Sequence, residues 1–477
     1  MRLSPEAVKA MDESRRQVDS FAAASEPIYG VSTGFGALAQ RHIPAADRVQ
    51  LQKSLIRSHA AGVGPSVEPE VVRAMMLLRL KTMCSGRTGV RTQLANTYAA
   101  VLNAHITPLV PEFGSLGCSG DLAPLSHCAL VAMGEGQAFS ATGALESASA
   151  LLTQAQIEPI ELREKEGLAL INGTDGMLGM LLLALADLRQ LVDFADLIAA
   201  MSVEAQLGTD QVFRPELHGP LRGHPGQVES ARRIFEALQG SEITKSHRHG
   251  DGVVQDAYSL RCAPQVSGAM RDTINHAEAV ADRELAATID NPIILESGEI
   301  TSNGNFHGAP VAYVLDFLAI AAADLASISE RRTDRFLDVS RNRGLPAFLA
   351  ADPGVDSGMM IAQYTQAALV SEMKRLANPA SVDSIPSSAM QEDHVSMGWH
   401  AGRKLRQSVA NLRRVLAIEL MVAARALELR APLQPAPATA ALLAELRTTV
   451  AGVGADRVVA NEIAAAEQLL IELANRP

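Results

Sequence analysis

The sequence predicts a mainly α-helical protein built around long, closely packed helices. Aromatic residues make up only 4% of the 477-residue chain, and alanine occurs throughout, which suits helix packing better than a sandwich or a barrel. Strand-like alternation of apolar and polar residues is rare. The chain also exceeds the size at which one hydrophobic core stops growing, so we expect more than one domain.

Two apolar segments predict the central helices. Residues 311–331 are apolar nearly all round except for Asp316 and Asp324, and such a helix is usually buried in a bundle or between subunits, which favours an oligomer. Residues 405–420 predict a helix with one buried face. Its apolar positions recur at steps of three and four and are Leu405, Val409, Leu412, Leu416 and Leu420.

Prolines end this helical pattern. Pro432, Pro435 and Pro437 interrupt the bundle sequence, because proline lacks the N–H that a helix interior needs. They separate a last helical segment at about residues 438–474.

Charge and cysteine usage limit the partners and the compartment. The net charge of −11 disfavours nucleic acid and anionic membranes, because phosphate contacts need clustered Lys and Arg. Cys84, Cys118, Cys128 and Cys262 form no CxxC pair, which favours reduced thiols and the cytoplasm. The N-terminus has no apolar signal region, and the longest uncharged apolar run, residues 176–186, is too short to span a bilayer. We therefore expect a cytoplasmic protein without membrane insertion.

Glycine- and asparagine-bearing loops are few and distinctive, and function tends to lie on such loops. They are YGVSTGFG (29–36), EFGSLGCSGDLAPLSH (112–127), INGTDG (171–176), VVQDAYSLRC (253–262), SNGNFHG (302–308) and SSAMQEDHVSMG (387–398).

The second of these loops contains a triplet that can do chemistry on its own backbone. Because glycine has no Cβ, the nitrogen of Gly120 can approach the carbonyl carbon of Cys118. Ring closure there, with loss of water from the Ser119 side chain, gives a five-membered ring with an exocyclic methylene, which is a strong electrophile. On the triplet alone we favour a plain turn that caps a helix, with Asp121 as N-cap and Pro124 in the first turn.

The ordered motifs change that interpretation. Together with KEGLALINGT, SVEAQLGTD, DNPI and SERRTDR, the six loops resemble the histidine ammonia-lyase family, within the aromatic amino acid lyases that use a methylidene-imidazolone (MIO) group. The resemblance implies a helical fold of the aromatic amino acid lyase or fumarase–aspartase-like type. It implies an N-terminal domain with the MIO loop (residues 1–190), and a central bundle with C-terminal helices (residues 191–477). It also implies a homotetramer whose active sites draw on more than one subunit.

The resemblance assigns the catalytic residues. Cys118, Ser119 and Gly120 form the MIO autocatalytically, Tyr29 takes the β-proton of the substrate, and Tyr258 is a further catalytic residue. A phenol acting as a base needs a depressed pKa, which nearby positive charge or hydrogen-bond donors provide. The alternative for Tyr29 is a tyrosine buried for packing.

The resemblance also assigns the substrate pocket. Arg261 would hold the substrate carboxylate, because its planar fork suits bidentate pairing. Asn172 and Asn305 also suit turn formation beside glycine, and both roles are compatible. The remaining pocket residues are Ser58, His59, Gln255, Phe306 and Glu392.

Two positions depart from the family pattern. Ser32 stands where Asn is usual and keeps a hydrogen-bonding group, so we expect only a local adjustment. Cys118 stands where Ala is typical. Ring closure uses only the carbonyl of this residue, so the thiol stays outside the ring.

The polar pair Ser58–His59, together with Glu392, indicates the substrate. By this resemblance, relatives that take phenylalanine or tyrosine carry Phe-Leu or His-Leu at the first pair, and phenylalanine lyases carry Gln at the position of Glu392. An imidazole finds hydrogen-bond partners there, whereas a phenyl ring leaves polar groups unsatisfied. The resemblance thus implies elimination of ammonia from L-histidine to give trans-urocanate. A phenylalanine or tyrosine lyase, an aminomutase and a non-catalytic scaffold stay open as alternatives.

A metal site is not expected. His247 and His249 lie one residue apart in a charged loop, without a third ligand at recognisable spacing. His218 and His224 flank a Gly-Pro turn and are interpreted as loop residues.

Overall fold

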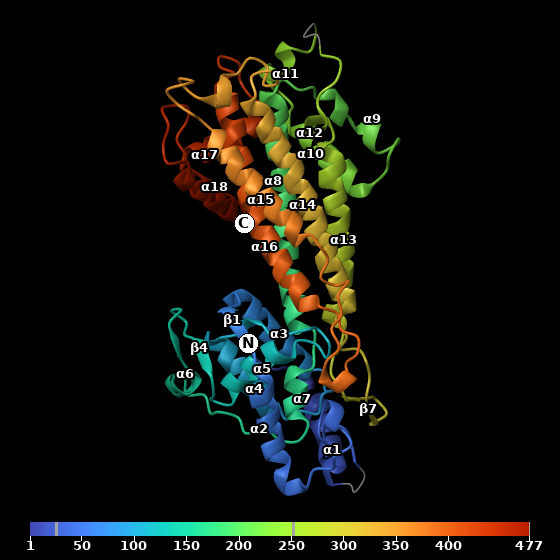
Figure 1. Ribbon diagram of the computed structural model, residues 1–477. Helices are drawn as coiled ribbons and strands as arrows, with labels where there is room; N and C mark the ends of the chain where they lie inside the picture. The colour runs from blue at the N-terminus through green and yellow to red at the C-terminus, as the bar shows by residue number, and fades with distance from the viewer. Residues whose placement is uncertain (24–26, 250–252, 477) are drawn as a thin grey trace. The chain divides into compact units, whose positions relative to one another are not determined.

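The computed structural model confirms the mainly α-helical fold (Figure 1). It describes residues 1–23, 27–249 and 253–476. The chain forms two compact units. Unit 1 comprises Met1–Leu183, Ala279–Leu315 and Pro379–Arg403, and unit 2 comprises Ala184–Glu278, Asp316–Asn378 and the chain from Lys404 onward. Both units are discontinuous in sequence, and the division into residues 1–190 and 191–477 stays a prediction.

Unit 1 carries short helices around one apolar core. Its helices are α1 (Pro5–Ala23), α2 (Arg48–His59), α3 (Pro69–Met83), α4 (Thr92–Asn103), α5 (Leu122–Ala132), α6 (Ala148–Gln154) and α7 (Glu166–Ile171), with 3₁₀ turns η1 (Gly36–Leu38), η2 (Ala45–Asp47) and η5 (Ser388–Met390). Pro69 occupies the first turn of α3, where the missing N–H costs nothing. The core includes the fully buried Tyr98, Met75 and Trp399, and each such side chain contributes about 1.5–3 kcal/mol by burial.

Three small antiparallel sheets in unit 1 lead into the functional loops. They are formed by β1 (Val63–Ser66) with β3 (Pro111–Phe113), by β2 (Thr107–Pro108), β4 (Gln137–Phe139) and β5 (Leu145–Ser147), and by β6 (Ile293–Ile294) with β7 (Ile300–Thr301). Strand β3 ends directly before the glycine-rich loop that precedes α5. The indole Nε1 of Trp399 donates to the carbonyl of Glu112 at 2.7 Å, so the 379–403 segment is tied to the same strand.

Four long helices contribute residues to both units. They are α8 (Asp175–Ala205), α13 (Ala263–Ala286), α14 (Ala309–Leu337) and α16 (Gly398–Glu428). Helices α14 and α16 contain the two segments predicted from apolar periodicity. Two stretches, Glu166–Ala205 and Ala309–Leu337, are long and apolar enough to cross a membrane by length and composition. The expectation from the longest uncharged run, residues 176–186, did not identify them. Their most apolar windows are 89% and 61% buried inside the protein, as in core helices.

The remaining helices belong to unit 2. They are α9 (Pro215–His218), α10 (Pro225–Ala237), α11 (Glu242–Ser246), α12 (Tyr258–Arg261), α15 (Met360–Leu376), α17 (Pro437–Arg447) and α18 (Val459–Ala474), with η3 (Gln211–Phe213) and η4 (Ala347–Leu349). A buried ion pair joins α14 and α16 within this unit: the Arg332 guanidinium donates to both carboxylate oxygens of Glu419, at 2.5 and 2.8 Å. Ser202 and Ser329 hydroxyls donate to the same carboxylate, so the buried charge is fully satisfied.

Two expectations from the sequence need correction. The last segment is two helices, because α17 ends at Arg447 and a glycine-bearing stretch around Gly452 precedes α18. His218 is buried at the end of α9, where its Nε2 lies 2.9 Å from the carbonyl oxygen of Val212, so it is a packed residue.

Candidate active site

The glycine-rich loop between β3 and α5 is held by short polar contacts within unit 1. The Ser115 hydroxyl accepts from Gly117 N at 3.1 Å and donates to Asp121 Oδ1 at 2.9 Å. The Ser396 hydroxyl donates to the Gly117 carbonyl at 2.8 Å. A Cβ at Gly117 would lie 2.2 Å from Ser396 Oγ, so only glycine allows this approach.

Gly120 packs directly against the turn that ends α7. Its φ is +78°, and an added Cβ would lie 2.1 Å from the Gly173 carbonyl oxygen and 2.6 Å from the Gly173 nitrogen. Asp121 N donates to that same carbonyl at 2.8 Å. The backbone of the Cys118–Gly120 triplet is therefore pressed against a second stretch of backbone.

Asp121 precedes α5, but its side chain caps a different helix. Oδ2 accepts from Gly176 N and Met177 N, both at 2.9 Å, in the first turn of α8. The expected capping of α5 is thus wrong for the side chain, because these donors and Ser115 take up the carboxylate. Burial raises the pKa of Asp121 to about 7, against the three hydrogen bonds, which favour the charged form.

Ser119 lines a hollow of about 520 Å³ in unit 1, together with five of the other expected site residues. These are Tyr29, Ser58, His59, Asn172 and Glu392. Glu392 Oε1 accepts from the Ser119 hydroxyl at 3.1 Å.

A second hollow, of about 710 Å³, shares Tyr29, Ser119 and Glu392 with the first and adds Cys118 and Phe306. Eight of the thirteen expected site residues thus line one or both hollows of unit 1.

His59 ends α2 with its ring fixed. Nδ1 lies 2.9 Å from the Leu55 carbonyl oxygen and 3.0 Å from Ser58 Oγ. Because a carbonyl only accepts, we assign the proton to Nδ1, which leaves Nε2 as an acceptor. Burial lowers the pKa of His59, and the carboxylate of Glu392 and the Leu55 carbonyl oppose this shift. The imidazole therefore faces the hollow in its neutral form at neutral pH.

Tyr29 is half-buried in the first loop, and its hydroxyl accepts from Gly36 N at 3.4 Å. Burial raises its pKa, the Gly36 hydrogen bond lowers it, and the Glu392 charge raises it further. We expected a base to have a depressed pKa, and in the single chain the pKa of Tyr29 is raised instead. Ser32 Oγ accepts from Ile28 N at 3.0 Å, so serine closes this loop locally, as expected for a residue that keeps a hydrogen-bonding group.

The Cys118 side chain packs into a small apolar cluster with Val395 and Met397. Burial and the neighbouring Glu392 carboxylate raise the pKa of Cys118 to about 12. The thiol therefore stays protonated at neutral pH and is a poor nucleophile.

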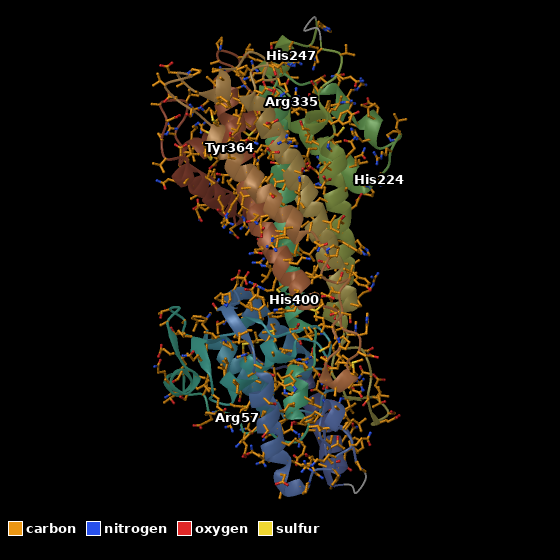
Figure 2. All side chains as sticks on the ribbon, in the orientation of Figure 1. Arg57, His224, His247, Arg335, Tyr364 and His400 are labelled. Carbon is orange, nitrogen blue, oxygen red and sulfur yellow. The ribbon has the colours of Figure 1, made fainter. Side chains whose placement is uncertain are left out.

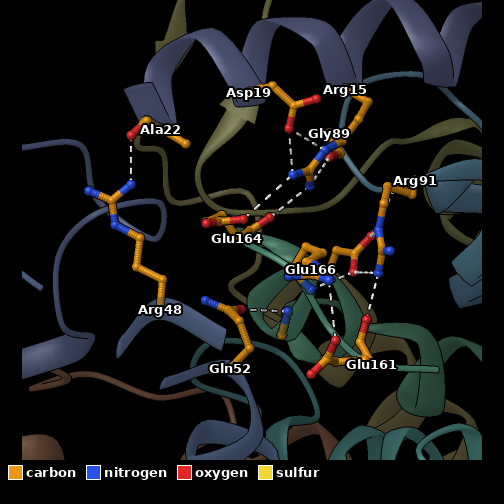
Figure 3. Close-up of polar contacts among 12 residues, drawn as sticks. Arg15, Asp19, Ala22, Arg48, Gln52, Gly89, Arg91, Glu161, Glu164 and Glu166 are labelled. Carbon is orange, nitrogen blue, oxygen red and sulfur yellow. Dashed lines mark hydrogen bonds and ion pairs between the residues drawn. The ribbon is translucent and has the colours of Figure 1, made fainter. Parts of the chain in front are cut away.

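Asn172 caps the C-terminus of α7, and α7 is anchored at its other end. The Glu166 carboxylate accepts from the Arg91 guanidinium at 2.8 to 2.9 Å, as Figure 3 shows, and Gly167 N donates to Gln52 at 2.8 Å. The Asn172 amide donates to the Asn291 carbonyl at 2.8 Å.

Asn305 is exposed in the 302–308 loop, and its N donates to Asn303 Oδ1 at 2.9 Å. It lines neither hollow. Its expected place in the pocket stays a prediction.

Gln255, Tyr258 and Arg261 lie in unit 2 and form a cluster of their own. Arg261 Nη2 donates to Gln255 Oε1 at 2.9 Å, and its guanidinium carbon lies 4.6 Å from the centre of the Tyr258 ring. Tyr258 is 72% exposed, so this cation–π pair is open to a ligand or a partner.

No group of three metal-ligating side chains occurs within the described ranges. His247, labelled in Figure 2, lies 2.8 Å from the Ile243 carbonyl oxygen through Nδ1 and 3.2 Å from the Gly208 carbonyl oxygen through Nε2. Both ring nitrogens thus have backbone partners.

Three side chains around the hollows were not singled out from the sequence. His307 and His394 line the second hollow with rings stacked 5.6 Å apart, and Ser387 donates to Glu392 Oε2 at 2.9 Å. All three lie inside the motifs SNGNFHG and SSAMQEDHVSMG, so their position in these motifs could have identified them from the sequence.

The fold and the hollows define a class of protein: a helical scaffold that brings a serine, a phenol and a carboxylate from separate loops together with an imidazole at the end of a helix. Comparison with known proteins narrows this class. The family model described as aromatic amino acid lyase matches residues 1–448. A histidine ammonia-lyase of Streptomyces avermitilis is 65% identical to this chain, over 98% of this chain and 91% of that protein.

Solved structures agree with this result. A tyrosine aminomutase from Streptomyces globisporus matches with a TM-score of 0.93 and 37% identity, over 99% of this chain and 92% of that one. A histidine ammonia-lyase from Trypanosoma cruzi matches with a TM-score of 0.90 and 38% identity, over 99% and 88%. The chain belongs to the aromatic amino acid lyase family, a family of carbon–nitrogen lyases that generally depend on MIO. This confirms the resemblance and the fold class expected from the motifs.

Proposed function

We propose that this chain is an ammonia-lyase that converts L-histidine into trans-urocanate and ammonia, as a step of histidine degradation. The observation that supports L-histidine as the substrate is that Ser119, His59 and Glu392 line the same hollow. The fixed His59 ring offers an acceptor nitrogen and the Glu392 carboxylate offers an acceptor oxygen, so a neutral imidazole can donate its N–H to one of them and an imidazolium can donate to both. A phenyl ring has no N–H to donate to either of these half-buried groups.

The triplet fits the MIO group. Ring closure needs a residue without a side chain at position 120, and the Gly173 backbone leaves no room for a Cβ there. Closure joins Gly120 N to the carbonyl carbon of Cys118, whose oxygen leaves as water with the amide protons of Ser119 and Gly120. Ser119 then loses its hydroxyl and its α-proton as a second water. The finished group supplies an electrophile for the substrate amine, which makes a poor leaving group easier to expel.

The remaining roles follow from where the side chains lie. Tyr29 lines both hollows, which supports its role in taking the β-proton, and Asn172 and Phe306 each line one of them, which supports a role in shaping the site. In the isolated chain the Glu392 charge raises the pKa of Tyr29. A substrate imidazole that donates to this carboxylate, and a nearby guanidinium, would both move the pKa of Tyr29 downward and make the phenol a better base.

We also propose that the site is completed by another copy of the chain in a cytoplasmic homotetramer. Gln255, Tyr258 and Arg261 form a ready carboxylate-binding cluster in unit 2, with Tyr258 exposed. On α14, Phe317 and Ile320 are each 46% exposed, and an apolar helix face of this kind is typical of an interface between subunits. Asn305 would join the pocket by the same assembly.

The test is a parallel ultraviolet assay with L-histidine, L-phenylalanine and L-tyrosine, combined with intact mass. We expect the chain to lack the mass of two water molecules and to release urocanate fastest. Faster turnover of phenylalanine or tyrosine, or appearance of a β-amino acid, would move the assignment to the sister lyases or aminomutases. A chain of full calculated mass without activity would make it a non-catalytic scaffold.

A further inference from the structure

Arg79 lies behind the turn that packs on Gly120, and none of the functional roles above uses it. The residue belongs to α3 and its side chain is fully buried. Its guanidinium donates from Nη1 to the Asn172 carbonyl and from Nη2 to the Ile289 carbonyl, both at 2.7 Å. Its Nε lies 3.4 Å from Asp175 Oδ2, which supplies the countercharge. One planar fork thus joins α3 to two other stretches of unit 1, residues 172–175 and the segment at Ile289.

The turn at Gly173 is enclosed between this guanidinium and the triplet. A Cβ at Gly173 would lie 2.8 Å from Arg79 Nη1, and a Cβ at Gly120 would lie 2.1 Å from the Gly173 carbonyl oxygen. Gly120 therefore contacts a turn whose opposite side rests on Arg79. If the turn moved away from the triplet, it would push against the Arg79 guanidinium, which the hydrogen bond to Ile289 and the ion pair with Asp175 hold in place.

A fixed wall matters for ring closure. The Gly120 nitrogen must come within bonding range of the Cys118 carbonyl carbon, and an unsupported loop relieves such crowding by moving apart. Bringing two groups into the reacting geometry costs a large part of the activation free energy, and a scaffold that holds them there removes this cost. A misplacement of about 1 Å lowers the rate on the order of a hundredfold. We propose that Arg79 is a positioning residue for maturation of the triplet, acting through the Asn172–Gly173 turn. This inference rests on the proposed function, because it concerns formation of the same MIO group.

The geometry defines the informative substitutions. Arg79→Lys keeps a positive charge beside Asp175, but a single amine cannot hold two carbonyls as a planar fork does. Arg79→Gln serves as a second variant that keeps donors without charge.

Arg48→Lys is the matched control. Arg48 is also buried and donates to two carbonyls, those of Ala22 at 2.6 Å and Ile43 at 3.2 Å, the first of which Figure 3 shows. None of its hydrogen bonds is to the turn that packs on Gly120.

Maturation is measured without any assay of activity. Each full-length chain is made by cell-free synthesis, translation is stopped, the folded fraction is isolated by gel filtration, and its intact mass is followed with time. Urea midpoints of the same fractions report stability. We expect the wild type and Arg48→Lys to lose two waters at similar rates, and both Arg79 variants to do so roughly tenfold to a hundredfold more slowly.

The proposal is overturned if the folded fraction of either Arg79 variant matures at the wild-type rate. It is also overturned if Arg48→Lys, at a comparable urea midpoint, is slowed as much as Arg79→Lys, since the delay would then reflect general destabilisation. A wild-type chain that never loses two waters would instead refute the proposed function itself.

Discussion

Replacing Glu392 by Gln changes the charge of the hollow while preserving its shape. With the triplet unmodified, the carboxylate accepts from the Ser119 hydroxyl at 3.1 Å and from the Ser387 hydroxyl at 2.9 Å. Maturation of the triplet removes the Ser119 hydroxyl, and the acceptor oxygen of a glutamine can still accept from the Ser387 hydroxyl. The free energy of unfolding should therefore fall by only about 1 kcal/mol.

The effect on catalysis should be larger. A hydrogen bond to a charged group contributes about 1.5–3 kcal/mol, and each 1.36 kcal/mol corresponds to about tenfold in rate. If the Glu392 carboxylate accepts the imidazole N–H of the substrate, Glu392→Gln should lower kcat/KM for L-histidine roughly tenfold to a hundredfold.

Urocanate absorbance gives kcat and KM, and urea unfolding gives stability. Ser387→Ala is the control, because it removes one hydrogen bond to the carboxylate but leaves its charge, and it should cost less activity. A Glu392→Gln enzyme within about twofold of the wild-type kcat/KM, or one that loses stability and activity in proportion, would refute the role in substrate binding.

Four further outcomes are expected. Ser119→Ala should fold with a urea midpoint near that of the wild type, keep its full calculated mass and show no turnover; near-normal turnover would remove the MIO hypothesis. Tyr29→Phe should still lose two waters yet lose most of kcat, because only the proton-transfer group is gone, whereas a wild-type rate would make Tyr29 structural. His59→Leu should raise the ratio of kcat/KM for L-phenylalanine to that for L-histidine, and an unchanged ratio would exclude His59 from recognition. Burial raises the pKa of Asp121 to about 7, so its contribution to stability is present below the unfolded pKa of about 3.9 and is lost as pH rises toward 7; the urea midpoint of Asp121→Asn should fall less than that of the wild type between these values, and parallel curves would contradict the shift.

Periodicity predicted the long helices because a buried helix face must repeat at 3.6 residues wherever it packs. It failed in the last segment, where the glycine-bearing stretch around Gly452 divides a pattern that composition alone leaves continuous. Capping was half right: Asp121 does precede α5, yet its carboxylate serves α8, since tertiary contacts decide which donors a buried side chain meets. The shift in the pKa of Tyr29 was opposite to the expectation, because burial and the charge of Glu392 depend on neighbours distant in sequence.

The sequence by itself determined the helical class, the chemistry available to the triplet and the residue types that surround it, since these depend on local composition and ordered motifs. Only the tertiary structure decided which of these residues meet. It brings Ser119 to Glu392 across 273 positions of the chain, and it presses Gly120 against a turn that Arg79 supports from the other side. Motif reading singled out Ser119 and Glu392, whereas Arg79 belongs to no loop motif. Its importance comes from the two carbonyls and the carboxylate that folding places around it.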